Sequence, residues 1–192
     1  MDMQWIILGA LGIVGLGLII IYNRLVALRQ TRNNAFSDID VQLKQRFDLV
    51  PNLVETVKGY ASHEKTVFEN VTNARAAVGR TNGLGAAAEH LRAEGALGGA
   101  LMGLFAVAEN YPQLKADSNF QQLQAELSDI ENKIAAARRF FNSATAEYNT
   151  AIQQFPANLI AGPLGFNSEL FFELAPGEAE AVKTPVQVKF GS

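Results

Sequence analysis

The stretch AFSDIDVQLKQRFDLVPNLVETVKGYASHE, residues 35–64, decides the fold of this chain. Apolar residues recur in it every seven positions, and others follow three or four positions later. The first set is Phe36, Leu43, Val50 and Val57, resumed at Val71 and Val78, and the second is Ile39, Phe47, Leu53, Val54, Tyr60, Val67, Phe68 and Ala74. Polar residues fall outside this pattern, at Asp38, Lys44, Gln45, Asp48, Asn52, Glu55 and Lys58. The pattern predicts an amphipathic helix with a heptad-like hydrophobic seam and a solvated opposite face.

Pro51 lies within this seam. A proline has no N–H to donate to the carbonyl four residues earlier, here that of Phe47, and its ring crowds that carbonyl. The helix therefore either ends near Val50 or continues with a kink. Because the seam keeps its register across Pro51, we expect a kinked but continuous helix in which Phe47 and Val54 face the same partner.

An uncharged apolar run, WIILGALGIVGLGLIIIY from Trp5 to Tyr22, precedes this helix. At about 1.5 Å per residue it would cover most of a hydrocarbon core about 30 Å thick, and its terminal aromatic rings suit the headgroup zone. A cleaved signal peptide would need a basic start and a small-residue cleavage site, whereas Asp2 precedes the run and YNRLVALRQ follows its apolar core. We expect a retained, single-pass membrane anchor.

The charges that flank this anchor predict its orientation. Arg24, Arg29 and Arg32 follow the run, and no Lys or Arg precedes it. Since positive flanks stay on the inner side, we expect a cell-membrane protein with the N-terminus outside and the body in the cytoplasm. No Gly or Pro occurs between Leu18 and Val50, so the membrane helix can continue into the body.

The composition excludes several classes of protein. Lys and Arg number 16 against 19 Asp and Glu, which gives a formal net charge of −3 and no basic excess to attract nucleic acid. The absence of Cys excludes a disulfide framework, a thiol nucleophile and a cysteine metal site. The length of 192 residues fits one domain with an appendage.

Two further helices are predicted after residue 78. The turn sequence GRTNGLG, residues 79–85, precedes a helix over residues 84–109 whose centre reads GALGGALMGLFAVA. Gly95, Gly99 and Gly103 share one side of that helix and would let a neighbouring helix, of this chain or of another copy, approach closely. The apolar centre is short for a membrane span, so we expect a buried core helix.

The third helix has the clearest periodicity in the chain. Ser118 and Gln121 form a capping-box pattern at its start, and Pro156 would end it. Its apolar residues are spaced by three or four throughout: Phe120, Leu123, Leu127, Ile130, Ile134, Ala137, Phe141, Ala144, Tyr148, Ala151 and Phe155. After it, the need to bury scattered phenylalanines predicts a packed tail, with a short strand where Val186, Val188 and Phe190 alternate.

These patterns together predict an all-α protein. Its N-terminal single transmembrane helix (residues 1–23) would continue into a long antiparallel bundle of about three helices (residues 24–156). An irregular, packed C-terminal tail (residues 157–192) would follow.

Residues suited to metal binding or acid–base chemistry are few. His63 and His90 are the only histidines, and neither has a second His three or four residues away, so a helix motif such as HExxH is absent. We expect both at the surface or at helix ends. Glu64 interrupts the seam, and it would pair with a basic residue across the bundle or lie at a fraying edge, with a functional acid as the alternative.

Other polar residues also favour structural roles. Asp38 and Asp40 are two apart on a helix and cannot point at one target. The adjacent Arg138 and Arg139 fit a solvated face better than an anionic-lipid site. The seven-residue spacing of Asn142 and Asn149 would let them bond to another helix and fix its register. With no GxSxG elbow, Walker-type loop or GxGxxG motif, we expect no catalytic residue, no cofactor and no metal.

Segments along the whole chain match one known family. They are YNRLVALR after the anchor, the stretch from residue 35 to 64, YPQLKADSNFQQLQAEL, IENKIAAARRFFN, EYNTAI and FPANLIAG. Together they resemble LemA proteins, and the glycine-rich segment from Gly95 to Gly103 is the least similar part. The resemblance implies a bacterial single-pass membrane protein with a long, coiled-coil-like helical body, and it implies no enzymatic activity.

The leading functional hypothesis is a non-enzymatic, membrane-anchored helical scaffold or adaptor. It would form a homo-oligomer and contact membrane lipid, with another membrane protein as a further candidate partner and no nucleic acid. The candidate assembly residues are Gly95, Gly99 and Gly103. Two alternatives stay open: an accessory or activator subunit of a membrane-bound hydrolase or protease, and a lipid-binding, membrane-shaping protein.

Overall fold

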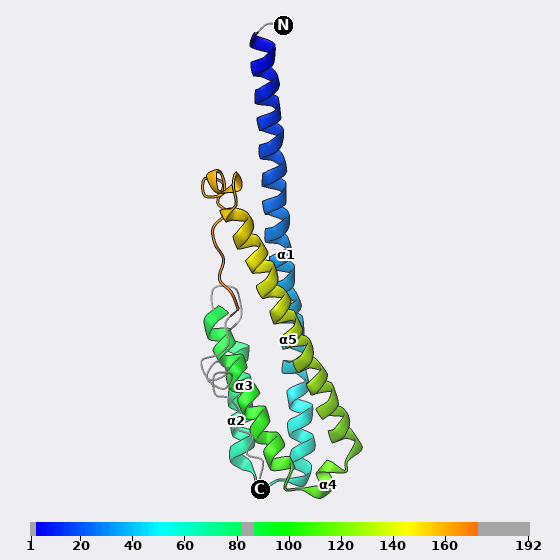
Figure 1. Ribbon diagram of the computed structural model, residues 1–192. Coiled ribbons are helices and arrows are strands. Elements are labelled where there is room, and N and C mark those ends of the chain that lie inside the picture. The colour runs from blue at the N-terminus through cyan, green and yellow to red at the C-terminus, as the bar shows by residue number, and fades with distance from the viewer. Residues whose placement is uncertain (1–2, 82–86, 173–192) are drawn as a thin grey trace, which may run out of the picture. The chain divides into compact units, whose positions relative to one another are not determined.

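The computed structural model describes residues 3–81 and 87–172, and the regular structure within them is helical (Figure 1). The helices are α1 (Met3–Tyr60), α2 (Lys65–Arg80), α3 (Ala87–Ala108), α4 (Pro112–Lys115) and α5 (Ser118–Gln153), followed by the 3-10 helix η2 (Ala157–Leu159). The predicted all-α class and long apolar N-terminal helix are confirmed. The strand expected at residues 186–190 lies outside the described residues.

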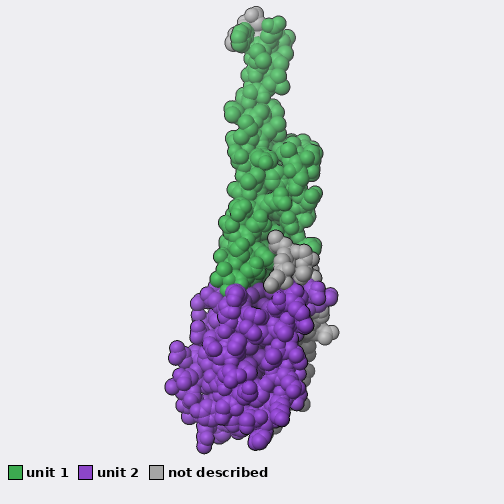
Figure 2. Space-filling view, turned by 180° about the vertical axis from the view of Figure 1, so that it is seen from behind, with its two compact units in different colours: residues 1–41, 134–172 green, residues 42–133, 173–192 purple. Residues whose placement is uncertain are grey.

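The chain divides into two compact units, which Figure 2 colours separately. The described part of unit 1 comprises residues 3–41 and 134–172, and that of unit 2 comprises residues 42–81 and 87–133. Helices α1 and α5 each contribute one segment to each unit. Each unit also has its own hydrophobic core.

Unit 2 is an antiparallel arrangement of the C-terminal part of α1, then α2, α3 and the N-terminal part of α5 (Figure 1). Its core buries Val50, Leu53, Val57, Ala61, Phe68, Val71, Val78, Ala93, Leu97, Leu101, Leu104, Ala108, Leu114, Phe120 and Leu127. Of the heptad residues in the quoted stretch, Leu43, Val50 and Val57 are buried and Phe36 is half-buried, whereas the polar residues predicted to lie off the seam are exposed. Burial of the apolar stripe drives these segments together.

The chain reverses direction at residues 61–64, where the sequence predicted a continued seam. Gly59 and Ser62 have poor helix propensity and flank the point at which α1 ends. The reversal brings Val57 of α1 and Val71 of α2 into one core. The sequence predicted one long helix here, and the structure has two. When the chain folds back, the apolar residues of α1 and α2 can be buried against each other, whereas one extended helix would leave them without a partner in the same chain.

Helix α1 continues through Pro51, as the register of the seam predicted. The carbonyl oxygen of Phe47, which Pro51 cannot bond, accepts the Nε–H of Arg75 in α2 at 3.0 Å. The Arg75 guanidinium also lies 3.9 Å from the centroid of the Phe47 ring. Phe47 and Val54 both pack against the unit 2 core. A side chain of the neighbouring helix therefore satisfies the acceptor that the proline leaves free.

Helix α5 begins at Ser118, but its cap is Asp117 and not the predicted pair of Ser118 and Gln121. Asp117 accepts the backbone N–H of Phe120 and the hydroxyl of Tyr60, each at 2.9 Å. These bonds, the one from Phe120 foremost, hold the pKa of the Asp117 carboxyl below its ordinary value. An ionised carboxylate also suits the positive end of the helix dipole, which explains why Asp117 takes this role.

Unit 1 pairs the N-terminal part of α1 with the C-terminal part of α5. Its core buries Leu25, Tyr148, Ala151, Ile152, Ala157, Ala161 and Phe166. The predicted seam of the third helix is buried along most of its length, but α5 ends at Gln153 and Phe155 is 80% exposed. Within the described residues α1 is the one helix long and apolar enough to cross a membrane, which supports a membrane localisation.

Candidate functional site

Helix α3 presents two different faces in unit 2. One face packs in the core through Ala93, Leu97, Leu101, Leu104 and Ala108. The opposite face, called here the glycine face, is exposed and consists of Gly95, Ala96, Gly99, Met102, Gly103 and Ala106. The exposed side of α2, in contrast, carries Lys65, Thr66, Glu69, Asn70, Thr72 and Asn73. A polar face is what water normally covers, so the glycine face is the unusual surface of this unit.

Helix α3 was expected to be a buried core helix, and the structure refines this expectation: one side of it is buried in the core and the opposite side is exposed. Gly95, Gly99 and Gly103 are exposed, and a Cβ added at Gly99 or Gly103 would meet no described atom within 4 Å. The sequence left open whether these glycines admit a helix of the same chain or of another copy. No helix of the described chain approaches Gly99 or Gly103 that closely.

A buried ion pair links α1 and α3 inside unit 2. Arg46 donates through Nη2 to the carboxylate Oε2 of Glu94, and their side chains are 4% and 1% exposed. Nη1 of Arg46 donates to Oε1 of Glu131 in α5 at 2.6 Å. Burial lowers the pKa of Arg46, but the two carboxylates outweigh that effect and the pKa is raised. Arg46 therefore stays charged and joins three helices.

Both histidines occupy places that explain them structurally. His63 is exposed in the turn after α1, as expected. His90 is half-buried in α3, with Nδ1 3.0 Å from the hydroxyl of Thr81 and Nε2 3.7 Å from Oε1 of Glu94. Among the described residues no group of three or more His, Cys, Asp or Glu side chains could hold a metal ion.

Glu64 was expected either to pair with a basic residue or to lie at a fraying edge, and in the structure it pairs with a tyrosine. It is half-buried at the start of α2, where its Oε1 accepts the hydroxyl of Tyr111 at 3.3 Å. Burial, followed by the charge of Glu64, raises the pKa of the Tyr111 hydroxyl. The start of α2 is a point at which chain direction changes, and this explains why the seam is interrupted there.

The two asparagines of α5 bind the tail of the chain and not another helix, which corrects the expectation for them. Asn142 donates to the carbonyl of Phe172 at 3.1 Å and accepts its N–H at 2.8 Å. Asn149 makes the same pair of bonds with Glu169, each at 2.9 Å. We call residues 169–172 the strap. Each side-chain amide thus pairs with the strap backbone as a neighbouring strand would.

The spacing of these asparagines matches the backbone that they bind. Seven residues of an α-helix rise about 10.5 Å, and three steps of an extended chain cover about 10 Å. Asn142 and Asn149 therefore bond Phe172 and Glu169, three residues apart, in a single antiparallel register. The seven-residue spacing does set a register, but of an extended segment along α5.

Charged and aromatic side chains add to the hold on the strap. Arg32 of α1 forms an ion pair with Glu169 at 3.2 Å and donates to the carbonyl of Leu170 at 3.4 Å. Arg138, expected on a solvated face, is half-buried with its guanidinium 4.7 Å from the centroid of the Phe172 ring. Arg139 is exposed, as expected. The strap is recognised through its backbone, one carboxylate and one ring.

The sequence contained signals for the Arg46 cluster that periodicity alone did not reveal. Arg46 stands seven residues after Ile39 and seven before Leu53, which places it on the buried face of α1. Glu94 precedes Leu97 by three residues and shares the buried face of α3. Two opposite charges on two apolar stripes predict an ion pair once the stripes are known to pack together.

Comparison with known proteins gives consistent relatives. A model described as the LemA family matches residues 35–190. The Magnetosome protein MamQ of Magnetospirillum gryphiswaldense is 27% identical over 187 residues, which cover 85% of this chain and 69% of that protein. Protein LemA of Metamycoplasma hominis is 26% identical over 163 residues, which cover 84% of this chain and 73% of that protein. Neither the family description nor these names states a reaction.

Proposed function

We propose that this chain, which belongs to the LemA family, is a non-enzymatic helical scaffold that is anchored in a membrane and associates with copies of itself. The observation that carries the proposal is the glycine face of α3. Between Arg92 and Glu109 this exposed face has no charged or hydrogen-bonding side chain. Its only large side chain is that of Met102, which is 74% exposed.

The glycine face suits a second helix because small residues four apart let two helix backbones approach closely. Glycine within an exposed helix costs about 0.5–1 kcal/mol relative to alanine, and no described atom near Gly99 or Gly103 offsets that cost. Contact with the same face of another copy would offset it, and a surface that meets itself is the usual basis of a symmetric dimer.

A non-enzymatic role is supported by the way the charged groups are used. Arg46 and Glu94 are engaged with each other in the core, and Arg32 and Glu169 fasten the strap. A catalytic acid or base needs a free, reachable proton site, whereas these groups are committed to structural pairs.

Replacing Gly99 by leucine tests the assembly surface. In the isolated chain Gly99→Leu is expected to raise helix stability by about 0.5–1 kcal/mol, because leucine is the better helix former and the site is open. In the assembly the new side chain would prevent close approach. We therefore expect unchanged helicity by circular dichroism and a smaller particle by light scattering in detergent.

Ala76→Leu on the exposed side of α2 is the matched control for this substitution, and it is expected to leave the assembly intact. Gly99→Leu protein that keeps its size would contradict an interface at the glycine face. Loss of helicity in Gly99→Leu would show instead that the glycines serve packing inside one chain.

We further propose that the N-terminus lies outside and the body in the cytoplasm, since Arg24, Arg29 and Arg32 follow the span. The chain has no Cys, so single cysteines can be introduced cleanly. An impermeant maleimide should label Asp2→Cys in intact cells and should label Thr72→Cys only after permeabilisation. Labelling of Thr72→Cys in intact cells would reverse the orientation.

A further inference from the structure

The segment that follows Glu147 carries no charge until Glu169. Apart from the anchor, no other stretch of the chain is uncharged for as long. It contains the end of α5 and the loop that follows, and we call residues 155–166 the hairpin tip. A surface loop normally carries charged residues, so this one requires an explanation.

The hairpin tip has one face inside unit 1 and one apolar face outside. Ala157, Ala161 and Phe166 are buried in the unit 1 core. Phe155 and Leu159, in contrast, are 80% and 65% exposed. The tip is therefore folded against the rest of unit 1. Phe155 and Leu159 are exposed although the segment that carries them is well packed.

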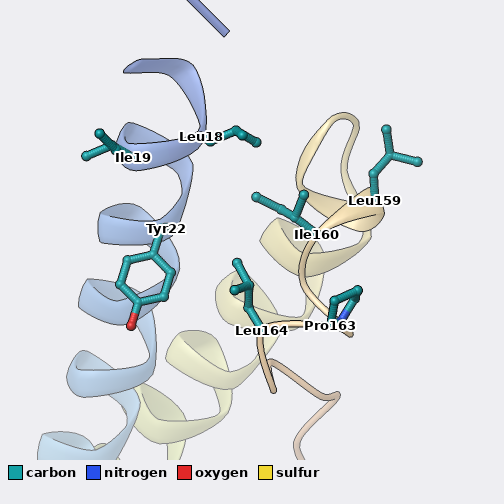
Figure 3. A pocket seen from close by; sticks show the side chains of 7 residues that line it. All are labelled: Leu18, Ile19, Tyr22, Leu159, Ile160, Pro163 and Leu164. Atoms are coloured by element: carbon teal, nitrogen blue, oxygen red, sulfur yellow. The ribbon is translucent and has the colours of Figure 1, made fainter. Parts of the chain in front are cut away.

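Part of this outer face joins the membrane helix in one apolar groove of about 440 Å³. The lining residues are Leu18, Ile19 and Tyr22 of α1 with Leu159, Ile160, Pro163 and Leu164 of the tip (Figure 3). Leu18 and Ile160 point toward each other across it (Figure 3). Leu18 and Ile19 belong to the apolar run that is predicted to span the membrane, so the groove would extend to bilayer depth.

The height of the tip along α1 follows from its contacts. Tyr22 ends the apolar run, and its ring lies 5.7 Å from that of Phe166. Leu18 is four residues further into the run, which is about 6 Å along the helix. Peripheral helices bury their apolar side chains about 5–10 Å into the headgroup and acyl boundary. The tip lies at that depth whenever α1 crosses the bilayer.

The loop is held in its conformation by its own backbone bonds. The N–H of Phe166 donates to the carbonyl of Ala161 at 2.9 Å, and that of Gly165 donates to Gly162 at 3.0 Å. Gly165 has φ +79°, a conformation that other residues rarely adopt. Because Ala157, Ala161 and Phe166 also pack with Leu25 of α1 in the unit 1 core, the tip cannot move away from α1 without breaking those contacts.

We propose that the hairpin tip is a second membrane-contact element, inserted into the interfacial layer beside the anchor with a lipid acyl chain in the groove. Lipid is favoured over a second protein surface because three of the groove residues, Leu18, Ile19 and Tyr22, belong to the predicted membrane span. The element would fix the tilt and rotation of unit 1 on the membrane, which a single span does not. It acts in either orientation of the chain.

Tryptophan quenching in vesicles tests this proposal. The chain has one tryptophan, so Trp5→Phe removes all tryptophan fluorescence, and Leu159→Trp is then introduced as the single fluorophore. Full-length protein is reconstituted into phosphatidylcholine vesicles with or without bromine on the upper acyl chain. The Leu159→Trp protein is expected to lose fluorescence to the brominated lipid and to be little quenched by aqueous acrylamide.

Leu170→Trp in the same background is the matched control, because Leu170 is an 85% exposed leucine of the same unit. The carbonyl of Leu170 accepts a hydrogen bond from Arg32. Arg32 is ten residues past Tyr22, which is about 15 Å along α1, so Leu170 would lie outside the bilayer. It should be quenched by acrylamide and not by brominated lipid. Acrylamide quenching of Leu159→Trp equal to that of Leu170→Trp would overturn the proposal. Protection of Leu159→Trp from both quenchers would also overturn it, because another protein surface would then cover the tip.

Discussion

Replacing Arg46 by methionine is expected to destabilise unit 2 by about 3–5 kcal/mol, because it leaves the carboxylate of Glu94 in the core without its guanidinium partner. Glu94 is 1% exposed and cannot reach water without opening the bundle. Removal of Glu94 by Glu94→Leu should cost less, since Arg46 keeps its bond to Glu131, whose side chain is 44% exposed. Denaturant unfolding followed by circular dichroism measures both losses.

The double variant Arg46→Met/Glu94→Leu separates an unpaired charge from a lost attraction. Buried ion pairs replaced by apolar residues of similar size are often neutral, so the double variant should be more stable than Arg46→Met alone. Lys44→Met is the surface control, because Lys44 pairs with Asp48 in solvent and should change stability by less than about 1 kcal/mol. If Arg46→Met unfolds no more easily than Lys44→Met, the ion pair does not hold the core together.

Loss of both Asn142 and Asn149, the α5 side chains that bind the strap, should release residues 169–172 from α5. Asn142→Ala and Asn149→Ala each leave one backbone N–H and one carbonyl of the strap without a partner, at about 1–3 kcal/mol for each substitution. Hydrogen exchange by mass spectrometry should show faster exchange of the Glu169 and Phe172 amides in the double variant. Exchange in α2 should not change.

Asn158→Ala supplies the control, since Asn158 is an exposed asparagine of the same unit. Arg32→Gln provides an independent test, because it removes the ion pair with Glu169 and keeps both asparagines. It should increase exchange at Glu169 more than at Phe172. Unchanged exchange of the strap in the double asparagine variant would mean that Phe172 packing alone holds it in place.

Hydrophobic periodicity predicted the helical class, the path of α1 through Pro51 and the buried face of α5. These features depend on residues three, four and seven apart, which a single helix brings together. The reversal at residues 61–64 was missed because Val71 and Val78 continue the same heptad whether the chain runs on or folds back. Only the packing of two segments on each other decides between those alternatives.

The candidate site was harder to predict, because its contacts join residues far apart in the chain. The glycines of α3 were identified by spacing, but spacing did not tell a buried face from an exposed one. Arg46 and Glu94 are 48 positions apart, so no local spacing in the sequence relates them. Asn142 and Asn149 pair with backbone atoms. Because residues of every type have the same backbone carbonyl, the sequence does not indicate which residues will be the partners.

The mass of the full-length protein tests the central proposal most directly. Wild-type protein is solubilised in mild detergent and measured by light scattering over a wide range of concentrations, with the bound detergent subtracted. Self-association through the glycine face predicts a protein mass of two or more chains that falls on dilution or on the Gly99→Leu substitution. A mass of one chain at every concentration would contradict the account, because a scaffold of copies requires copies to meet.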